Sequence, residues 1–183
     1  MPYTDLTLHA LERLSRGREA VRDLAPALST FRIRPEDWAS EGAAQPLLAD
    51  VGRSAGSGRS LYLLQVSDAD IPSTSLSELR DCFSEAKNRW AGLLKFPRLN
   101  KVEPSRVLYV GSSLTLRSRI KEHLGYGADQ TFALRLNRWA PAFELDLLVA
   151  SYDPSSPDEA VLFLEDTLWR RVTPMFGRPG SAR

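Results

Sequence analysis

The sequence predicts an α/β or α+β domain in which a small three-stranded sheet is flanked by helices. Three short apolar runs, at residues 61–66, 107–110 and 143–151, have the length and composition of buried or half-buried strands. Helical patterns occupy the intervals between these runs, and a further helix follows the last run. Strands that alternate with helices are typical of a layered domain whose helices pack against one sheet.

The clearest helix lies between the first two strands, at residues 76–94. Ser75 and Glu78 have the spacing of a capping box at its start, and Pro97 follows its end. Its apolar positions recur at spacings of three and four, as in a helix with one buried face: Leu76, Leu79, Phe83, Ala86, Trp90 and Leu93. This helix fills most of an insertion at about residues 68–105.

Two more helices follow the second and third strands. A basic helix is expected at residues 114–124, after a tight turn at Gly111-Ser112-Ser113. The last helix is expected at residues 156–172, with Ser156 as its N-cap and Pro157 in its first helical position.

Residues 1–58 form a mostly helical accessory segment in this interpretation. A helix is expected at residues 9–28 and a short ordered stretch at residues 31–38. A run rich in Gly and Ser at residues 52–60 is typical of a flexible connection. We therefore place a boundary there and assign residues 59–183 to the main domain.

The composition excludes several protein classes. The chain has 183 residues with 24 Lys and Arg against 23 Asp and Glu, so its net charge of +1 indicates no partner. Cys82 is the only cysteine and there are two histidines, too few for an internal disulfide or a structural zinc site. No apolar run reaches the length of a membrane span, and the start lacks a signal-peptide pattern. We expect a globular cytoplasmic protein with no membrane partner.

Glu165 stands out in the last helix, because it falls within the apolar stripe that contains Val161 and Leu168. A carboxylate that faces a core is costly unless a cation or a metal ion meets it. The spacing fits either a structural salt bridge or a metal ligand.

The basic helix carries a second candidate site. Arg119 and His123 are four residues apart and share one face. Between residues 98 and 123 there are six basic and two acidic residues, a pattern that fits either a phosphate-binding surface or an ordinary solvated helix face. Backbone N–H groups of the turn at Gly111-Ser112-Ser113 are a further candidate for anion binding.

These residues occur in an order that resembles the GIY-YIG nuclease family. Ser60-Leu61-Tyr62 matches the first tyrosine motif and Tyr109-Val110-Gly111 the second. Arg119 and His123 then take the family's arginine and histidine or tyrosine positions, and Glu165 takes that of its metal ligand. Pro174 corresponds to the proline that follows. The resemblance covers residues 59–180, about two-thirds of the chain.

The resemblance implies a metal-dependent endonuclease that hydrolyses phosphodiester bonds in DNA. Glu165 would hold Mg²⁺ or Mn²⁺, and Arg119 would stabilise charge on the scissile phosphate. Tyr62 would act as general base, while Tyr109 and His123 would position the phosphate and assist proton transfer.

The remaining contacts with DNA are assigned to the basic helix and the turn before it. Arg117 and Lys121 of that helix would bind DNA together with the turn residues Gly111, Ser112 and Ser113.

Three departures keep other functions open. The first motif has Ser60 in place of glycine, the insertion separates Tyr62 from Tyr109 by 46 residues, and Gly177 occupies the position of a common asparagine. An inactive nucleic-acid-binding module of the same fold is one alternative. Another is a protein-interaction subunit whose helix at residues 76–94 docks a protein partner. The Phe83 and Trp90 stripe of that helix could equally form a homodimer surface, and a dimer would be one way for a nuclease to cut both strands.

Overall fold

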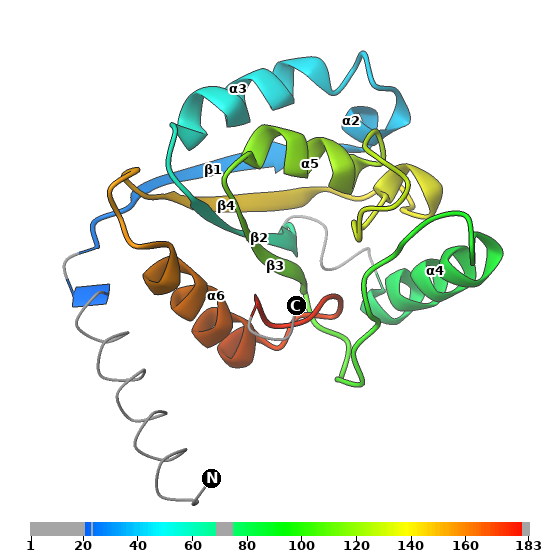
Figure 1. The fold of residues 1–183 in the computed structure, drawn as a ribbon. Coiled ribbons are helices and arrows are strands. Elements are labelled where there is room, and N and C mark those ends of the chain that lie inside the picture. Colours follow the sequence, from blue (N-terminus) through cyan, green and yellow to red (C-terminus); the bar gives the residue numbers. More distant parts are fainter. Residues whose placement is uncertain (1–20, 23, 69–74, 181–183) are drawn as a thin grey trace, which may run out of the picture.

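The protein folds around one four-stranded antiparallel sheet with helices on both faces (Figure 1). The computed structural model describes residues 21–22, 24–68 and 75–180. The strand order is β1 (Ala27–Ile33), β4 (Leu145–Ser151), β2 (Ser60–Val66) and β3 (Val107–Ser113). The α+β class is confirmed, but the expectation of three strands is wrong.

The additional strand, β1, comes from the segment that was expected to be mostly helical. It pairs with β4 along its whole length, from Ala27 opposite Ser151 to Ile33 opposite Leu145. Pro26 disfavours continuation of a helix into these residues. Because β1 lies at the sheet edge, several of its side chains are exposed, with Leu28 at 78%. A mostly exposed strand carries no apolar run, which is why the sequence pattern failed here.

The other three strands lie close to their predicted positions. β2 lies between β4 and β3 and is almost completely buried, which explains its continuous apolar sequence. β3 is longer than predicted, because Gly111-Ser112-Ser113 continues the strand and pairs with residues 60–62 of β2. The expected tight turn at these residues is therefore wrong. The chain leaves the sheet only after Ser113.

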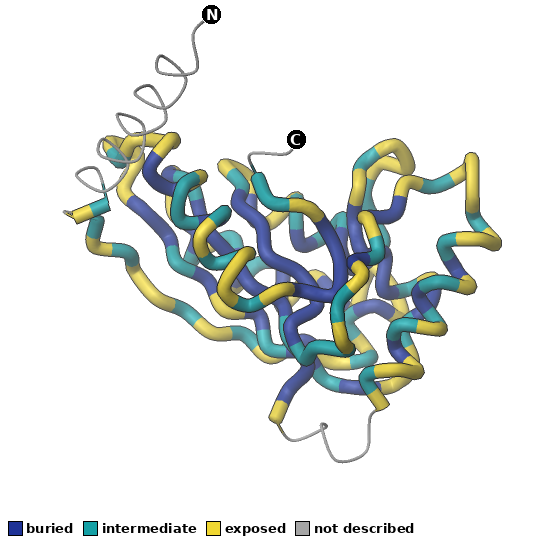
Figure 2. The backbone as a smooth tube through the Cα atoms, turned by 90° about the horizontal axis from the view of Figure 1, so that it is seen from below, coloured by how far each residue is buried: buried dark blue, intermediate teal, exposed yellow. Residues whose placement is uncertain are grey.

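Helices α2 (Pro35–Ala39), α3 (Gln45–Ala55) and α5 (Leu116–Leu124) lie on one side of the sheet, and α6 (Asp158–Val172) lies on the other (Figure 1). α3 packs against α5 and β1, and the boundary predicted near residue 58 falls in the loop between α3 and β2. α6 begins one residue later than expected, with Pro157 as N-cap. Figure 2 shows the buried backbone concentrated in the sheet between these layers.

The insertion contains α4 (Leu76–Arg89) and packs at the β3 side of the domain. Its predicted cap is present, since the Ser75 hydroxyl accepts a hydrogen bond from the Glu78 backbone at 3.3 Å. Phe83 is fully buried against Phe96 and Phe176, with ring centroids 5.7 and 4.0 Å away. The centre of the apolar stripe thus fills the domain's own core, which removes the main reason to expect a partner or a second copy on it.

Two core clusters border the sheet. The larger lies on the α3 and α5 side and extends to α4 through Leu79 and Phe83. The smaller lies on the α6 side and includes Leu61, Val110 and Val161. Within the described residues, no helix combines the length and apolar character that a bilayer span requires.

Candidate active site

Four of the five predicted catalytic side chains form one hydrogen-bonded cluster on the α5 side of the sheet. The hydroxyl oxygen of Tyr62 lies 2.9 Å from Nε2 of His123. Arg119 donates from Nε to the Tyr62 hydroxyl at 3.1 Å and from Nη2 to the Tyr109 hydroxyl at 3.2 Å. Adjacent strands supply the tyrosines, and one face of α5 supplies the arginine and histidine. The i,i+4 spacing thus brings Arg119 and His123 to the same pair of strands.

The Arg119 guanidinium is held on several sides. Besides the two tyrosines, it donates to the Glu122 carboxylate at 2.7 Å and to the Phe132 carbonyl oxygen at 2.7 Å. Glu122 was not predicted as a site residue, although an acid three residues after an arginine on a helix is a recognisable pair. The guanidinium is fixed by four acceptors, which lie in β2, β3, α5 and the loop at Phe132.

The surroundings of Arg119 favour its charged form. Burial acts to lower its pKa, but the oxygens of Tyr62 and Tyr109 raise it. The hydrogen bond to Glu122 adds to this effect, and the pKa stands well above the ordinary value for arginine. Arg119 therefore carries a permanent positive charge, although its side chain is only 14% exposed.

The hydrogen bonds of His123 define the tautomer of its neutral ring. Its Nδ1 accepts a hydrogen bond from the Leu134 backbone N–H at 3.2 Å. The proton of the neutral imidazole therefore resides on Nε2, which points to the Tyr62 hydroxyl. Tyr62 consequently accepts hydrogen bonds from both His123 and Arg119. Both donors stabilise negative charge on the phenol oxygen.

Gly111 lies against the side chains of both tyrosines. A Cβ atom at this position would come within 2.7 Å of the Tyr62 hydroxyl and 2.9 Å of Tyr109 Cε1. The two rings stack with centroids 6.1 Å apart and planes inclined by 17°. The glycine is therefore required by close packing of the tyrosines, a role that the expected turn did not include.

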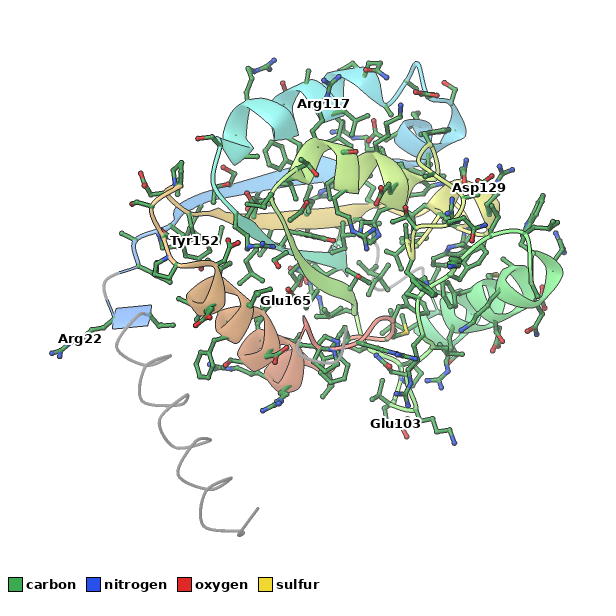
Figure 3. The ribbon with its side chains drawn as sticks, viewed as in Figure 1. Arg22, Glu103, Arg117, Asp129, Tyr152 and Glu165 are labelled. Carbon is green, nitrogen blue, oxygen red and sulfur yellow. The ribbon has the colours of Figure 1, made fainter. Side chains whose placement is uncertain are left out.

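Glu165, the predicted metal ligand, lies on the other side of the sheet from this cluster. Figure 3 shows Glu165 on the sheet-facing side of α6, whereas Arg117 of α5 lies beyond the opposite face. The Glu165 side chain is fully buried, and its Oε2 accepts a hydrogen bond from the Ser112 hydroxyl at 2.6 Å. The alternation of β3 explains this separation, since Gly111 and Ser112 face opposite sides of the sheet.

The segment after α6 contacts both the tyrosine cluster and Glu165, which lie on opposite sides of the sheet. A Cβ at Gly177 would lie 2.9 Å from Tyr109 Cε2, and one at Gly180 would lie 3.1 Å from Glu165 Oε2. Met175 and Phe176 donate backbone hydrogen bonds at 2.9 Å to Val107 and Leu108, at the start of β3. The chain from residue 175 to 180 thus follows the edge of β3 from the tyrosines to Glu165.

Glu165 has the oxygen chemistry that magnesium and manganese ions take, although its carboxylate is fully buried against the chain at Gly180. Mg²⁺ commonly takes one or two carboxylates and keeps several waters, and the Ser112 hydroxyl adds a second oxygen here. Among the residues described, no group of three or more His, Cys, Asp or Glu side chains is placed to hold a metal. Soft or many-coordinate metal sites therefore do not match the described donor set.

Arg117 and Lys121, which were predicted to bind DNA, lie away from the cluster. They line a small cavity of about 250 Å³ with Gln45 of α3. Lys121 forms an ion pair with Glu41 at 2.6 Å, and Arg117 donates to Gln45 at 3.5 Å. On a helix, residues two positions from Arg119 point to the opposite side. Ser113, also predicted to bind DNA, accepts a hydrogen bond from the Thr115 backbone at 3.0 Å.

A larger cavity of about 750 Å³ opens beside Arg119. Its walls come from α4, β3, the loop before η1 (Leu136–Arg138) and the chain after α6. The residues that line it are Lys87, Phe96, Pro97, Arg98, Tyr109, Arg119, Thr131, Phe132, Gly177 and Arg178. Only Tyr109 and Arg119 were predicted as site residues. The others come from α4 and from three short segments at residues 96–98, 131–132 and 177–178, so no local pattern marks them as one surface.

Comparisons with known proteins found no matching family model, no matching curated protein and no matching solved structure. The functional argument therefore depends on the residues and their geometry.

Proposed function

We propose that the protein is a metal-dependent endonuclease that hydrolyses phosphodiester bonds in DNA. The observation that carries the proposal is the fixed Arg119 guanidinium, which joins the two tyrosines and borders a cavity lined by further cations. A planar, permanently charged group in such a place suits a phosphate that gains negative charge during reaction.

The cluster supplies the groups that hydrolysis needs. The water oxygen attacks phosphorus, its proton passes to the phenol oxygen of Tyr62, and the bond from phosphorus to the leaving oxygen breaks. Arg119 and His123 both donate to that phenol oxygen, which favours the deprotonated form that a general base requires. Tyr109, held by Arg119, orients the phosphate, and the leaving oxygen takes up a proton from solvent water to give a hydroxyl group.

Glu165 would hold the metal ion, with the Ser112 hydroxyl beside it. When bound, Mg²⁺ or Mn²⁺ neutralises charge on the phosphate oxygens. Glu165 is fully buried, with the chain at Gly180 against its carboxylate, and it lies on the opposite side of the sheet from Arg119. The proposal therefore requires the surroundings of Glu165 to rearrange before an ion held there can meet the phosphate.

A second candidate function is a nucleic-acid-binding module without catalysis. The same burial of Glu165, together with its short hydrogen bond from Ser112, favours this alternative. A carboxylate used only as a buried acceptor would stabilise the contact between α6 and β3.

A cleavage assay separates these candidates. Supercoiled plasmid, linear duplex and single-stranded DNA are incubated with the protein in Mg²⁺, in Mn²⁺ and in chelator, beside the variants Glu165→Ala and Glu165→Gln. The endonuclease proposal requires cleavage in metal that is lost in chelator and in both variants. Arg53→Ala is the control, because this exposed residue of α3 pairs with Asp50 and takes no part in the cluster. DNA binding without cleavage under every condition would favour the binding module.

A further inference from the structure

The large cavity beside Arg119 brings together cations from separate parts of the chain. Lys87 comes from α4, and Arg98 and Arg178 come from two strands of chain that pair with each other. The Gly177 backbone donates to the Arg98 carbonyl at 2.8 Å, next to the bridge between Leu99 and Phe176. The two exposed arginines are thus held at one rim by backbone pairing.

These like charges oppose one another in the structure. Burial lowers the pKa of Lys87, and the neighbouring Arg178 and Arg98 lower it further. None of the described residues that line the cavity is acidic. Four cationic side chains around one cavity therefore form a site for an anion, which would relieve their mutual repulsion. Arg119 connects this site to the tyrosine cluster.

An exposed aromatic ring lies at the same cavity. Phe132 is 58% exposed, although large apolar side chains are usually buried. Its backbone carbonyl accepts a hydrogen bond from Arg119 Nη2 at 2.7 Å, which fixes the backbone that carries the ring relative to the cluster. Lys95 Nζ lies 5.5 Å from the centre of its ring. An exposed ring beside cations is the combination that binds a base and its phosphates.

We propose that this cavity binds an unpaired stretch of DNA strand next to the scissile phosphate. Phosphates of that strand contact Lys87, Arg98 and Arg178, and one base stacks on Phe132. In a duplex, base faces are covered by their neighbours, so only an unpaired base can stack on the ring. The volume of this cavity lies in the range of clefts that bind small ligands. A cleft of that volume accommodates a few nucleotides of one strand better than a double helix. The inference rests on the proposed nuclease function and specifies its substrate as branched or single-stranded.

The test measures binding and not cleavage, so it is independent of catalysis. Fluorescence anisotropy follows a labelled oligo-dT strand of about 12 nucleotides, a blunt duplex, and the same duplex with a dT overhang, all in chelator. The double variant Arg98→Ala/Arg178→Ala removes two rim charges. The matched control is Arg170→Ala/Arg171→Ala, which removes two exposed charges from α6 outside the cavity. Phe132→Leu and Phe132→Trp test stacking at constant charge.

The proposal requires the overhang to strengthen duplex binding about tenfold. The Arg98 and Arg178 variant must weaken oligo-dT binding at least tenfold and lower its salt slope by about 1.4. Phe132→Leu must weaken binding, and Phe132→Trp must preserve it. Equal losses in both arginine pairs, or equal affinity for blunt and overhanging duplex, would overturn the inference. If cleavage persists in those cases, only the strand-binding inference is rejected and the proposed nuclease function stands. If the strand binds as expected but is not cleaved, only the proposed nuclease function is rejected.

Discussion

The Tyr62 hydroxyl and the His123 Nε2 atom lie 2.9 Å apart, although 61 positions separate these residues in the chain. The other ring nitrogen of His123 accepts from the Leu134 backbone, so its Nε2 proton faces the phenol oxygen. Arg119 donates to the same oxygen at 3.1 Å. Tyr62 is therefore an acceptor that joins β2 to α5, and the proposed mechanism uses the same oxygen as its proton acceptor.

Tyr62→Phe should lower the cleavage rate by about 10²–10⁴-fold, because the proton acceptor is removed. It should also cost about 1–3 kcal/mol of stability, since buried donors lose their acceptor. Single-turnover kinetics and urea denaturation measure the two effects. Tyr126→Phe is the control: its hydroxyl donates to the Trp38 carbonyl at 2.7 Å, outside the cluster, and cleavage should be unchanged. Equal rates in parent and Tyr62→Phe would exclude Tyr62 as the base.

Arg119→Lys should keep a positive charge but lose most of the fixed contacts to the tyrosines, Glu122 and Phe132. We expect the single-turnover rate at saturating DNA to fall about 10²–10³-fold. The comparison of rates at low and saturating DNA decides the role of this residue. If only the apparent affinity falls, Arg119 is a phosphate clamp and does not stabilise the transition state.

Gly111→Ala should displace the two buried tyrosines and also lower stability by about 1–3 kcal/mol, as overpacking of a core does. The added methyl group would contact the Tyr62 hydroxyl and the Tyr109 ring, so these side chains must move apart. We expect cleavage to fall at least about tenfold, because small displacements of reacting groups are costly. Gly42→Ala is the matched control, since a Cβ there meets no atom within 4 Å. Unchanged cleavage in Gly111→Ala would show that the tyrosine spacing is not critical.

The ion pair between Arg59 and Asp158 should make stability depend on acidic pH. Arg59 donates from Nε and Nη2 to the carboxylate at 2.7 and 2.9 Å, which lowers the pKa of Asp158. A folded-state pKa below the unfolded one means that this contribution is complete above about pH 4 and disappears as pH falls through the folded value.

Asp158→Asn should therefore lower stability at pH 6 by about 0.5 kcal/mol, since the pair is partly exposed. The difference from the parent protein should shrink progressively as the pH falls below about 4, because the Asp158 carboxylate becomes protonated. Thermal melting across this range measures it. A difference that persists unchanged at low pH would exclude the ion pair as its source.

The order of the site residues in the sequence predicted one catalytic site of five residues, and four of them form a cluster in the structure. Tyr62, Tyr109, Arg119 and His123 come together because alternation places the tyrosines on one side of the sheet and helical spacing aligns the other two residues. Glu165 was expected in the same site but lies on the α6 side, bonded to Ser112. Its position in an apolar helix stripe indicated burial, and the pattern alone could not show which face of the sheet covers it.

The sequence by itself determined the elements whose own side chains are buried. The apolar run of β2, the alternation of β4 and the periodicity of α4 each record local contact with a core. Tertiary structure decided what depends on distant partners: β1 becomes a strand by pairing with β4, and β3 extends through Gly111 by pairing with β2. It also assembled the cavity beside Arg119 from α4, β3 and the chain after α6. Edge pairing and shared cavities depend on segments far apart in the chain, so no local sequence pattern encodes them.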